Sequence, residues 1–129
     1  MVHQLSYIEN GSILIRNFHG TVQFSEIMES WIELIGHQKI TDEIKGILND
    51  FTGAELQMNI NNLDQLMSTF MQYPDIFERI KLAVLMDTPK KIVLPILAEQ
   101  KYPQFRIKAF STYEAAIEWI KENDHNLMP

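Results

Sequence analysis

Polar side chains that could bind or activate a ligand come directly after three predicted strands. They are Asp50, Thr52 and Gly53; Asp87 and Thr88; and Ser111 and Thr112. In open α/β sheets, ligands bind beyond the carboxyl ends of parallel strands, and the helices that follow direct free N–H groups to the same edge. We therefore predict a binding site at this strand-end edge.

The same residue types also have purely structural roles. Thr88 and Ser111 are suited to cap helices, Gly53 to form a turn, and the Asp50 carboxylate to accept hydrogen bonds from nearby backbone. Catalysis with Asp50 or Asp87 as general base requires a cleft, a perturbed carboxylate pKa and a second polar group within hydrogen-bond reach. The sequence alone leaves these alternatives open.

Two lysines follow Thr88-Pro89, a pair that predicts the start of a helix with a capping hydroxyl and proline at the first position. Lys90 and Lys91 then fall in the first turn, where the helix dipole disfavours each positive charge by ~0.3–1 kcal/mol. They could meet an anionic ligand, a lipid headgroup or an acidic partner. The alternatives are neutralisation by Asp87 or simple solvation.

The segment from Ile92 to Ala98 is apolar on every side of the predicted helix, although a cover helix needs only one apolar stripe. Pro95 should kink or shorten this helix. The segment is either buried core or a contact surface, and the contact surface could be a dimer interface, the wall of an apolar pocket or, less favoured by its length, a membrane-surface contact.

Most catalytic signatures are missing from the chain. The four histidines, His3, His19, His37 and His125, have no metal-ligand spacing, and no nucleophile elbow, Walker loop or dinucleotide fingerprint occurs. The absence of cysteine excludes thiolate zinc sites and a cysteine nucleophile. A net charge of −6 argues against nucleic acid as partner. We predict no cofactor and no metal.

The elements that must position these residues alternate along the chain. The 129 residues suit a single domain, 1–129. Asn10-Gly11 predicts a hairpin between strands 5–9 and 12–16, because both turn residues tolerate the positive φ that the turn requires. The remaining expected elements are a helix capped by Thr21 and ended by Gly36, a strand 46–51, a loop 54–61, a helix capped by Asn61 or Asn62, a strand 80–86, the helix after Thr88-Pro89, a strand 105–110 and a helix opened by the capping box 111–114.

This order, β-β-α-β-α-β-α-β-α, predicts an α/β fold with a mixed, mostly parallel sheet and covering helices. The start of the chain has no basic segment followed by an apolar one, as a secretory signal would have. The longest nearly apolar run, 92–98, is far shorter than the ~20 residues of a spanning helix. We expect a cytoplasmic protein without a transmembrane segment.

Two stretches resemble the SpoIIAA-like or STAS family, and more narrowly its small stand-alone STAS/CRAL-TRIO-like branch. Asp50-Phe51-Thr52-Gly53-Ala54 is similar to the family's Asp-Leu-Ser-Gly-Val after the central strand, and 110–120 resembles its closing strand and helix. The resemblance implies a SpoIIAA-like fold over nearly the whole chain. It also implies a scaffold that binds a protein partner or a small, often apolar, ligand, as bacterial regulators of this type do.

One feature of the family is missing. Its anti-sigma-factor antagonists carry a phosphorylated serine near the start of the next helix, and that place falls near Asn59 or Ile60 here. Neither side chain can accept a phosphoryl group, and no serine or threonine lies between Gly53 and Ser68. We therefore do not expect the phosphorylation switch in this chain.

We predict a non-catalytic binding module for a protein partner or a small apolar or anionic ligand, with a homodimer as a further possibility. The predicted site consists of Asp50, Thr52, Gly53, Asp87, Thr88, Lys90, Lys91, Ile92 and Leu94. One alternative is a carrier of a lipid or another hydrophobic molecule, with an internal pocket bordered by Ile92, Leu94 and the methionine-rich second helix. The other is a small hydrolase-type enzyme that uses Asp50 or Asp87.

Overall fold

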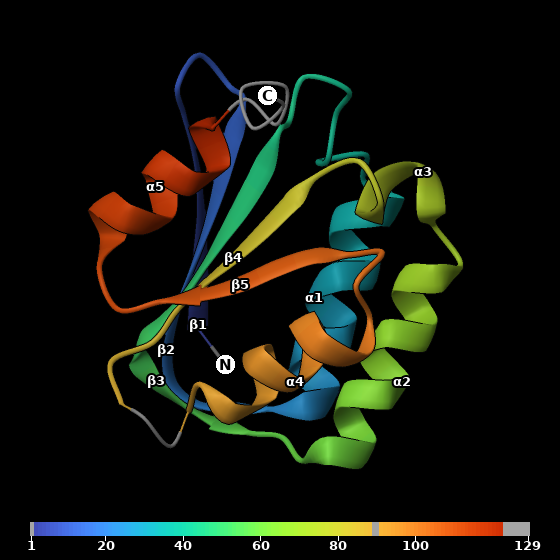
Figure 1. Cartoon of the computed structure of the whole chain (residues 1–129), viewed down its shortest axis with the longest axis vertical. Helices are drawn as coiled ribbons and strands as arrows, with labels where there is room; N and C mark the ends of the chain where they lie inside the picture. Colours follow the sequence, from blue (N-terminus) through green and yellow to red (C-terminus); the bar gives the residue numbers. More distant parts are fainter. Residues whose placement is uncertain (1, 89–90, 123–129) are drawn as a thin grey trace.

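A five-stranded sheet with helices on both faces forms the part of the chain described by the computed structural model, residues 2–88 and 91–122 (Figure 1). The strands are β1 (Val2–Ile8), β2 (Ile13–Gln23), β3 (Gly46–Gln57), β4 (Lys81–Leu85) and β5 (Arg106–Phe110). The helices are α1 (Phe24–Gly36), α2 (Ile60–Met71), α3 (Pro74–Phe77), α4 (Val93–Lys101) and α5 (Tyr113–Lys121). The predicted order is therefore confirmed, with the short α3 as an addition.

The strands lie in the order β1-β2-β3-β4-β5. β1 runs antiparallel to β2 and every other pair is parallel, so the predicted mixed, mostly parallel sheet is confirmed. Asn10 and Gly11 both have positive φ in the hairpin turn, as predicted, and Glu9 joins them. The hairpin closes on the pair Ile8 and Ile13.

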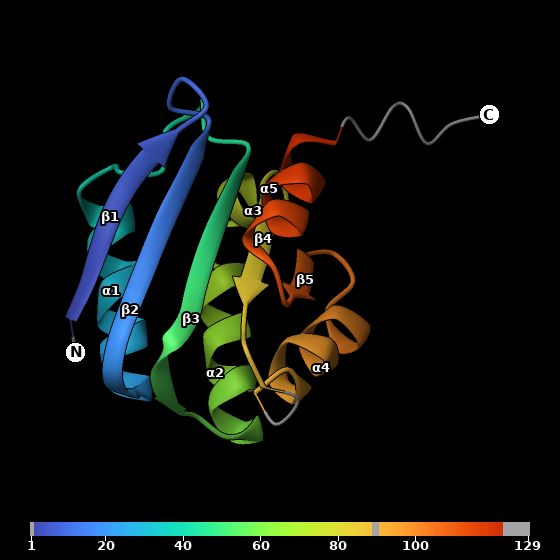
Figure 2. The same ribbon diagram turned by 90° about the vertical axis from the view of Figure 1, so that its left-hand side faces the viewer.

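Alternate residues of the central strands pack against different helices, because successive side chains of a strand point to opposite faces. Leu14 and Phe18 of β2 belong to the larger apolar cluster, which includes buried residues of α1, α2 and α4. Ile13 and Ile15 belong to a smaller cluster with Ala116 and Ile120 of α5. Figures 1 and 2 show α5 on one face of the sheet and α1, α2 and α4 on the other.

Two strands are longer than predicted. Thr21 does not cap α1; it pairs with Glu55 inside a continued β2–β3 ladder. β3 therefore runs on through the expected loop to Gln57, and Gly53 lies in the strand rather than in a turn. The register shifts between Asn17 and His19, which marks a bulge. Residues 20–23 of β2 and 54–57 of β3 pair with each other. Because each segment is extended only by pairing with the other, the local sequence pattern of neither predicts it.

The helix ends also differ by one to three residues from the prediction. The N-cap of α1 is Gln23 rather than Thr21. The backbone N–H of Gln23 donates to Glu26 Oε1 at 2.9 Å. Gly36 is the last residue of α1, and the positive φ falls on Gln38. The N-cap of α2 is Asn59, where Asn61 or Asn62 was predicted. The N-cap of α5 is Thr112, where Ser111 was predicted.

The fourth helix starts later than predicted. Thr88 does not cap it; α4 begins at Val93 with Ile92 as N-cap, and the apolar Ile92 side chain makes no capping hydrogen bond. Pro95 is the third helical residue, where the missing N–H has no intrahelical partner to lose. Pro89 lies outside the described residues. The proline thus shortens the helix, which is one of the two outcomes expected from the sequence.

Candidate functional site

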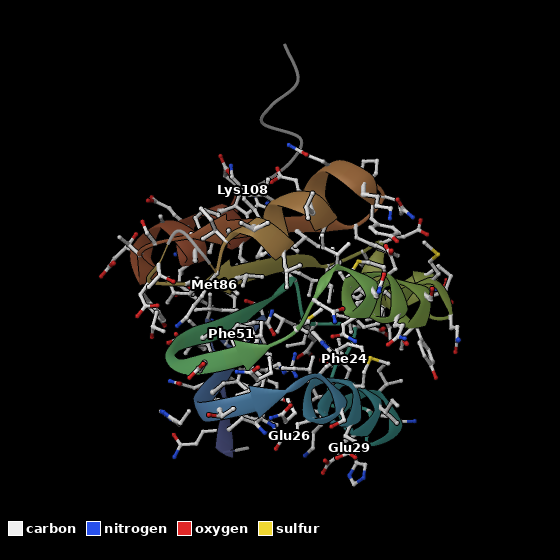
Figure 3. All side chains as sticks on the ribbon, turned by 90° about the horizontal axis from the view of Figure 1, so that it is seen from below. Phe24, Glu26, Glu29, Phe51, Met86 and Lys108 are labelled. Atoms are coloured by element: carbon white, nitrogen blue, oxygen red, sulfur yellow. The ribbon has the colours of Figure 1, made fainter. Side chains whose placement is uncertain are left out.

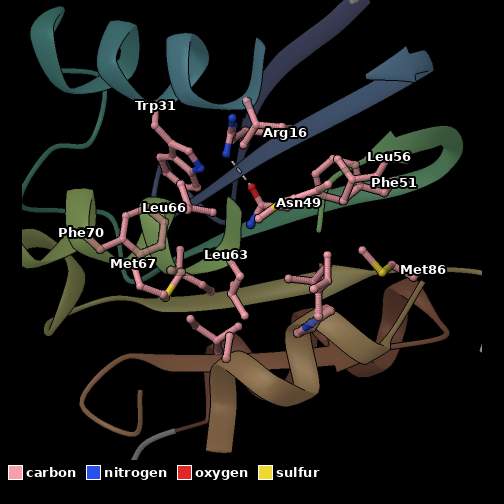
Figure 4. A pocket seen from close by; sticks show the side chains of 18 residues that line it. Arg16, Trp31, Asn49, Phe51, Leu56, Leu63, Leu66, Met67, Phe70 and Met86 are labelled. Atoms are coloured by element: carbon pink, nitrogen blue, oxygen red, sulfur yellow. Dashed lines mark hydrogen bonds between the residues drawn. The ribbon is translucent and has the colours of Figure 1, made fainter. Parts of the chain in front are cut away.

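An apolar pocket of about 80 Å³ lies between the sheet and helices α1, α2 and α4 (Figure 4). Leu94, Pro95 and Ala98 of α4 cover one side, and β3 and β4 contribute Phe51 and Val84 from the sheet. The other apolar lining residues are Ile27, Trp31, Leu56, Met58, Leu63, Leu66, Met67, Phe70, Leu82, Met86 and Ile107. The pocket therefore offers a surface on which an apolar body can be removed from water.

Phe51 and Met86 of the lining are buried, and Figure 3 shows them inside the molecule, whereas Glu29 lies on the outer side of α1. Phe51 stacks on Phe18 with ring centroids 4.6 Å apart, so the sheet side of the pocket is held by aromatic packing. Met58, Met67 and Met86 line the pocket with flexible thioether chains, which can adapt to a bound shape.

Two polar side chains, Arg16 and Asn49, interrupt the apolar wall. They are only 1% and 4% exposed. Arg16 Nη1 donates to Asn49 Oδ1 at 2.8 Å, the contact drawn as a dashed line in Figure 4. Asn49 Nδ2 in turn donates to the Ala83 carbonyl at 3.1 Å, which fixes the amide with its oxygen toward the arginine.

The Arg16 guanidinium is bound by neutral groups rather than by a carboxylate of the described residues. Its Nη2 donates to Ser30 Oγ, and Ser30 Oγ donates to the Ile27 carbonyl at 2.8 Å. Within residues 2–88 and 91–122, no carboxylate forms an ion pair with this group, and its Nε is buried without a hydrogen-bond partner. Burial lowers the pKa of Arg16 to about 9, so the group still carries its charge at pH 7.

Aromatic rings enclose the same cation. The guanidinium carbon lies 3.9 Å from the Trp31 ring centroid and 4.9 Å from that of Phe18. The negative faces of the rings attract the charge and replace part of its lost hydration. Hydrogen bonds to neutral acceptors and two aromatic rings thus hold Arg16 in one position.

Lys91, which lies just before α4, connects this segment to β3 by hydrogen bonds. Its Nζ donates to the Ala54 carbonyl at 2.7 Å and to Asp87 Oδ1 at 3.0 Å, and the Phe51 carbonyl lies 3.5 Å away. The hydrogen bond from Lys91 lowers the pKa of Asp87. Lys91 precedes α4 instead of lying in its first turn, so the expected conflict with the helix dipole does not arise. Lys90 lies outside the described residues.

The other end of α4 is tied to α2. Asp64 of α2 accepts hydrogen bonds from Lys101 Nζ at 2.9 Å and from the Tyr102 hydroxyl. These bonds, that from Tyr102 first, lower the pKa of Asp64 and raise the pKa of both partners. The helix that covers the pocket is therefore held by polar contacts at both ends.

The predicted strand-end site is only partly assembled. Asp50 and Thr52 lie within β3, where the Asp50 Oδ1 accepts from the Thr52 N–H at 2.9 Å and from the Thr52 hydroxyl at 2.7 Å. Asp87 is brought to Lys91, as the neutralisation alternative predicts. Thr88 is exposed, and its carbonyl accepts from the Lys91 N–H at 3.2 Å.

The apolar segment 92–98 divides between interior and surface. Leu94 lines the pocket, whereas Ile92 packs on the larger apolar cluster outside the lining. Val93 and Ile96 are the exposed positions, at 52% and 39%. The predicted pocket is thus bordered by Leu94 and by methionines, but not by Ile92.

Arg16 and Asn49 were not among the predicted site residues, although the sequence carries a signal for Arg16. It stands between Leu14 and Phe18 in an alternating row whose other members face the core, and a charge in such a row breaks the local rule. Because Arg16 is the last residue of the predicted strand 12–16, a charged side chain at this position did not indicate a buried site. Asn49 gives no comparable signal.

Neither Asp50 nor Asp87 lines the pocket. Within the described residues, no group of three or more histidine and acidic side chains is placed to hold a metal ion. In the same part of the chain, no helix is long and apolar enough to cross a membrane.

No family model matches the sequence, and no curated protein matches it. Solved structures do match. One is an uncharacterised DUF3478-family protein with a SpoIIAA-like fold from Shewanella loihica PV-4 (TM-score 0.61, 14% identity, 92% of each chain covered). Another is an anti-sigma factor antagonist from Mycobacterium paratuberculosis (TM-score 0.62, 12% identity, 94% of each chain).

A third similar structure is the anti-sigma factor antagonist SpoIIAA in its unphosphorylated form (TM-score 0.55, 13% identity, 95% of this chain and 100% of that one). The likeness in each case extends over nearly the full length of both chains. The SpoIIAA-like fold predicted from the sequence is therefore confirmed.

Proposed function

We propose that this chain is a non-catalytic binding module that takes a small, mainly apolar molecule into the pocket beneath α4. The observation that carries the proposal is the pocket itself, in which side chains from three helices and the sheet leave an apolar space next to the core. Protein interiors are close-packed and keep few spaces larger than a water molecule, and small-molecule sites are lined mainly by apolar side chains. Of the functions expected from the sequence, carriage of a hydrophobic molecule fits this feature best.

The size of the pocket limits the ligand. Its volume of about 80 Å³ is below the ~300–1,000 Å³ of drug-sized ligand sites. A ligand of a few carbon atoms fits directly, and a chain of eight carbon atoms enters when the methionines or the middle of α4 move outward. The polar contacts of α4 lie at its two ends, around Lys91 and Tyr102, so its middle can shift with the loss of few hydrogen bonds.

Two features support a role in binding rather than catalysis. Lys91 holds the Asp87 carboxylate and lowers its pKa, which weakens it as a general base. Asp50 is occupied by two hydrogen bonds from Thr52 and lies outside the pocket. Neither carboxylate therefore lines the cleft that the enzyme hypothesis requires, and Asp87 is in addition the weaker base.

A protein partner is the second candidate function. Val93 and Ile96 form an exposed apolar pair on the outer face of α4, and two proteins of similar fold are anti-sigma factor antagonists. We place the contact on this face, next to Asp87 and Lys91. Val93→Glu would then abolish association with the partner without unfolding the chain.

The pocket proposal can be tested with 1-octanol as a neutral apolar probe. We expect 1-octanol to raise the Tm of the natural chain, because a ligand that binds only the folded state stabilises it by mass action. Ala98→Leu places three more carbon atoms in the pocket and should remove this effect. Ala115→Leu, the same change at an exposed position of α5, should leave it intact. An equal response of all three chains would contradict the proposal.

A further inference from the structure

We propose that the pocket selects a monoanion, a small carboxylic acid with an apolar body, and that Arg16 binds its carboxylate. This inference rests on the proposed function and specifies the ligand class. Arg16 lines the pocket together with apolar side chains and Asn49. A ligand with its carboxylate at Arg16 and its carbon chain along Leu63, Met67 and Leu94 would satisfy both parts of the lining.

The first support is the missing counter-ion. A buried charge is costly to remove from water and is normally paired. The chain has 17 acidic residues, yet none of those described forms an ion pair with Arg16. A carboxylate brought by the ligand would supply the charge that the fold leaves out.

The second support is the unused hydrogen-bond donor. Arg16 Nε is fully buried and donates to no acceptor, whereas buried donors in folded proteins almost always have one. In a guanidinium, the Nε–H and a neighbouring Nη–H point the same way and match the two oxygens of a carboxylate. Arg16, which lines the pocket, therefore keeps one donor without an acceptor, and a carboxylate that displaces the side chains around it would supply one.

The third support is the rigidity of the group. Asn49, Ser30 and the Trp31 ring hold the guanidinium by contacts on different sides. The aromatic contacts replace only part of the hydration of the charge and provide no acceptor for Nε. A cation held in position before the ligand arrives loses little freedom on binding, which favours affinity.

The composition of the lining favours a carboxylate over a phosphate group. Among the described residues, Arg16 is the only cation in the lining, and Asn49 contributes an uncharged amide. A phosphate monoester carries about −1.5 to −2 charges at pH 7 and three acceptor oxygens. One guanidinium balances a carboxylate but leaves a phosphate with excess charge in an apolar space.

Octanoate and 1-octanol test this inference, because they share the chain and differ in the head group. We expect octanoate to bind the natural chain about tenfold more tightly than 1-octanol in calorimetric titrations at pH 7, although 1-octanol is the less polar molecule. The Arg16 Nε–H resonance should shift with octanoate and not with 1-octanol. The carboxyl pKa of bound [1-¹³C]octanoate should lie below that of free octanoate.

Arg16→Met should remove the preference for octanoate while 1-octanol still binds. Lys108→Met is the matched control, since it removes one positive charge from an exposed position outside the pocket lining. Should Arg16→Met fail to fold, the resonance and the ¹³C titration on the natural chain decide the question without it.

The possible failures are distinguishable. Equal binding of octanoate and 1-octanol overturns the assignment to Arg16 and leaves the apolar pocket standing. Binding of neither probe overturns both proposals. A preference for octanoate that survives in Arg16→Met overturns the assignment and places the anion elsewhere.

Discussion

Arg16 and Asn49 are register partners across the parallel pair β2–β3, and Arg16 Nη1 donates to Asn49 Oδ1 at 2.8 Å. Both side chains replace apolar residues in rows that otherwise face the larger apolar cluster. Because buried polar groups are costly when unpaired, this contact specifies how the two central strands pair as well as where the pocket is polar.

Asn49→Leu should destabilise the fold by about 1–3 kcal/mol, because it leaves Arg16 Nη1 and the Ala83 carbonyl without their partner. Urea unfolding of the purified variant measures the change. Asn61→Leu, the same substitution at an exposed position of α2, should stay within about 0.5 kcal/mol of the natural chain. Equal changes in the free energy of unfolding for the two substitutions would contradict a stabilising role of the Arg16–Asn49 contact.

The contact of Asp64 with Tyr102 and Lys101 should make stability depend on acid pH. The pKa of Asp64 is lowered from its ordinary value of 3.8 on folding, so its contribution is complete above that value and is lost as the pH falls through the lower, folded pKa. Unfolding free energies measured from about pH 5 to about pH 2 should therefore fall more steeply for the natural chain than for Asp64→Asn. Parallel curves would contradict this role of Asp64.

Lys91→Met should loosen the start of α4 and cost about 0.5–1.5 kcal/mol, because the Ala54 carbonyl loses its donor. The pKa of Asp87 should rise toward its ordinary value when the lysine is removed. Carboxyl titration by NMR gives the pKa, and amide hydrogen exchange across 91–101 reports the loosening. An unchanged pKa of Asp87 would mean that the ion pair does not form in solution.

Two substitutions on α4 should separate its interior from its surface. Leu94→Lys should cost about 1–3 kcal/mol, because it brings a second positive charge to the pocket lining that already holds Arg16. Val93→Lys, the same change at an exposed position, should remain within about 0.5 kcal/mol. Thermal unfolding compares the two, and size-exclusion chromatography of Val93→Lys also tests the expected possibility of a homodimer through this face.

The sequence was sufficient to predict the fold because its strongest patterns are local. Leu63, Leu66, Met67 and Phe70 recur at helical spacing and are all buried in α2. The nearly continuous apolar run 80–86 is typical of a strand covered on both faces, and Leu82 and Ala83 of β4 do belong to opposite clusters. Such patterns predict an element and its buried face without reference to the rest of the chain.

The element ends and the site depend on contacts between distant segments. The strand-end site was predicted on the premise that the strand 46–51 ends before Thr52. Pairing with β2 extends β3 to Gln57 instead. That extension moves Thr52 and Gly53 into the strand and adds Leu56 to the pocket wall. Arg16 meets Ser30, Asn49 and Trp31 only after folding, so its role could not be read from spacing.

Native mass spectrometry of the natural chain and of Ala98→Leu, each incubated with octanoate, shows whether the pocket beneath α4 binds a ligand. We expect a single octanoate adduct on the natural chain that is lost on denaturation, and none on Ala98→Leu, whose pocket is filled. A bare mass for the natural chain, or the same adduct on both chains, would contradict a ligand pocket beneath α4.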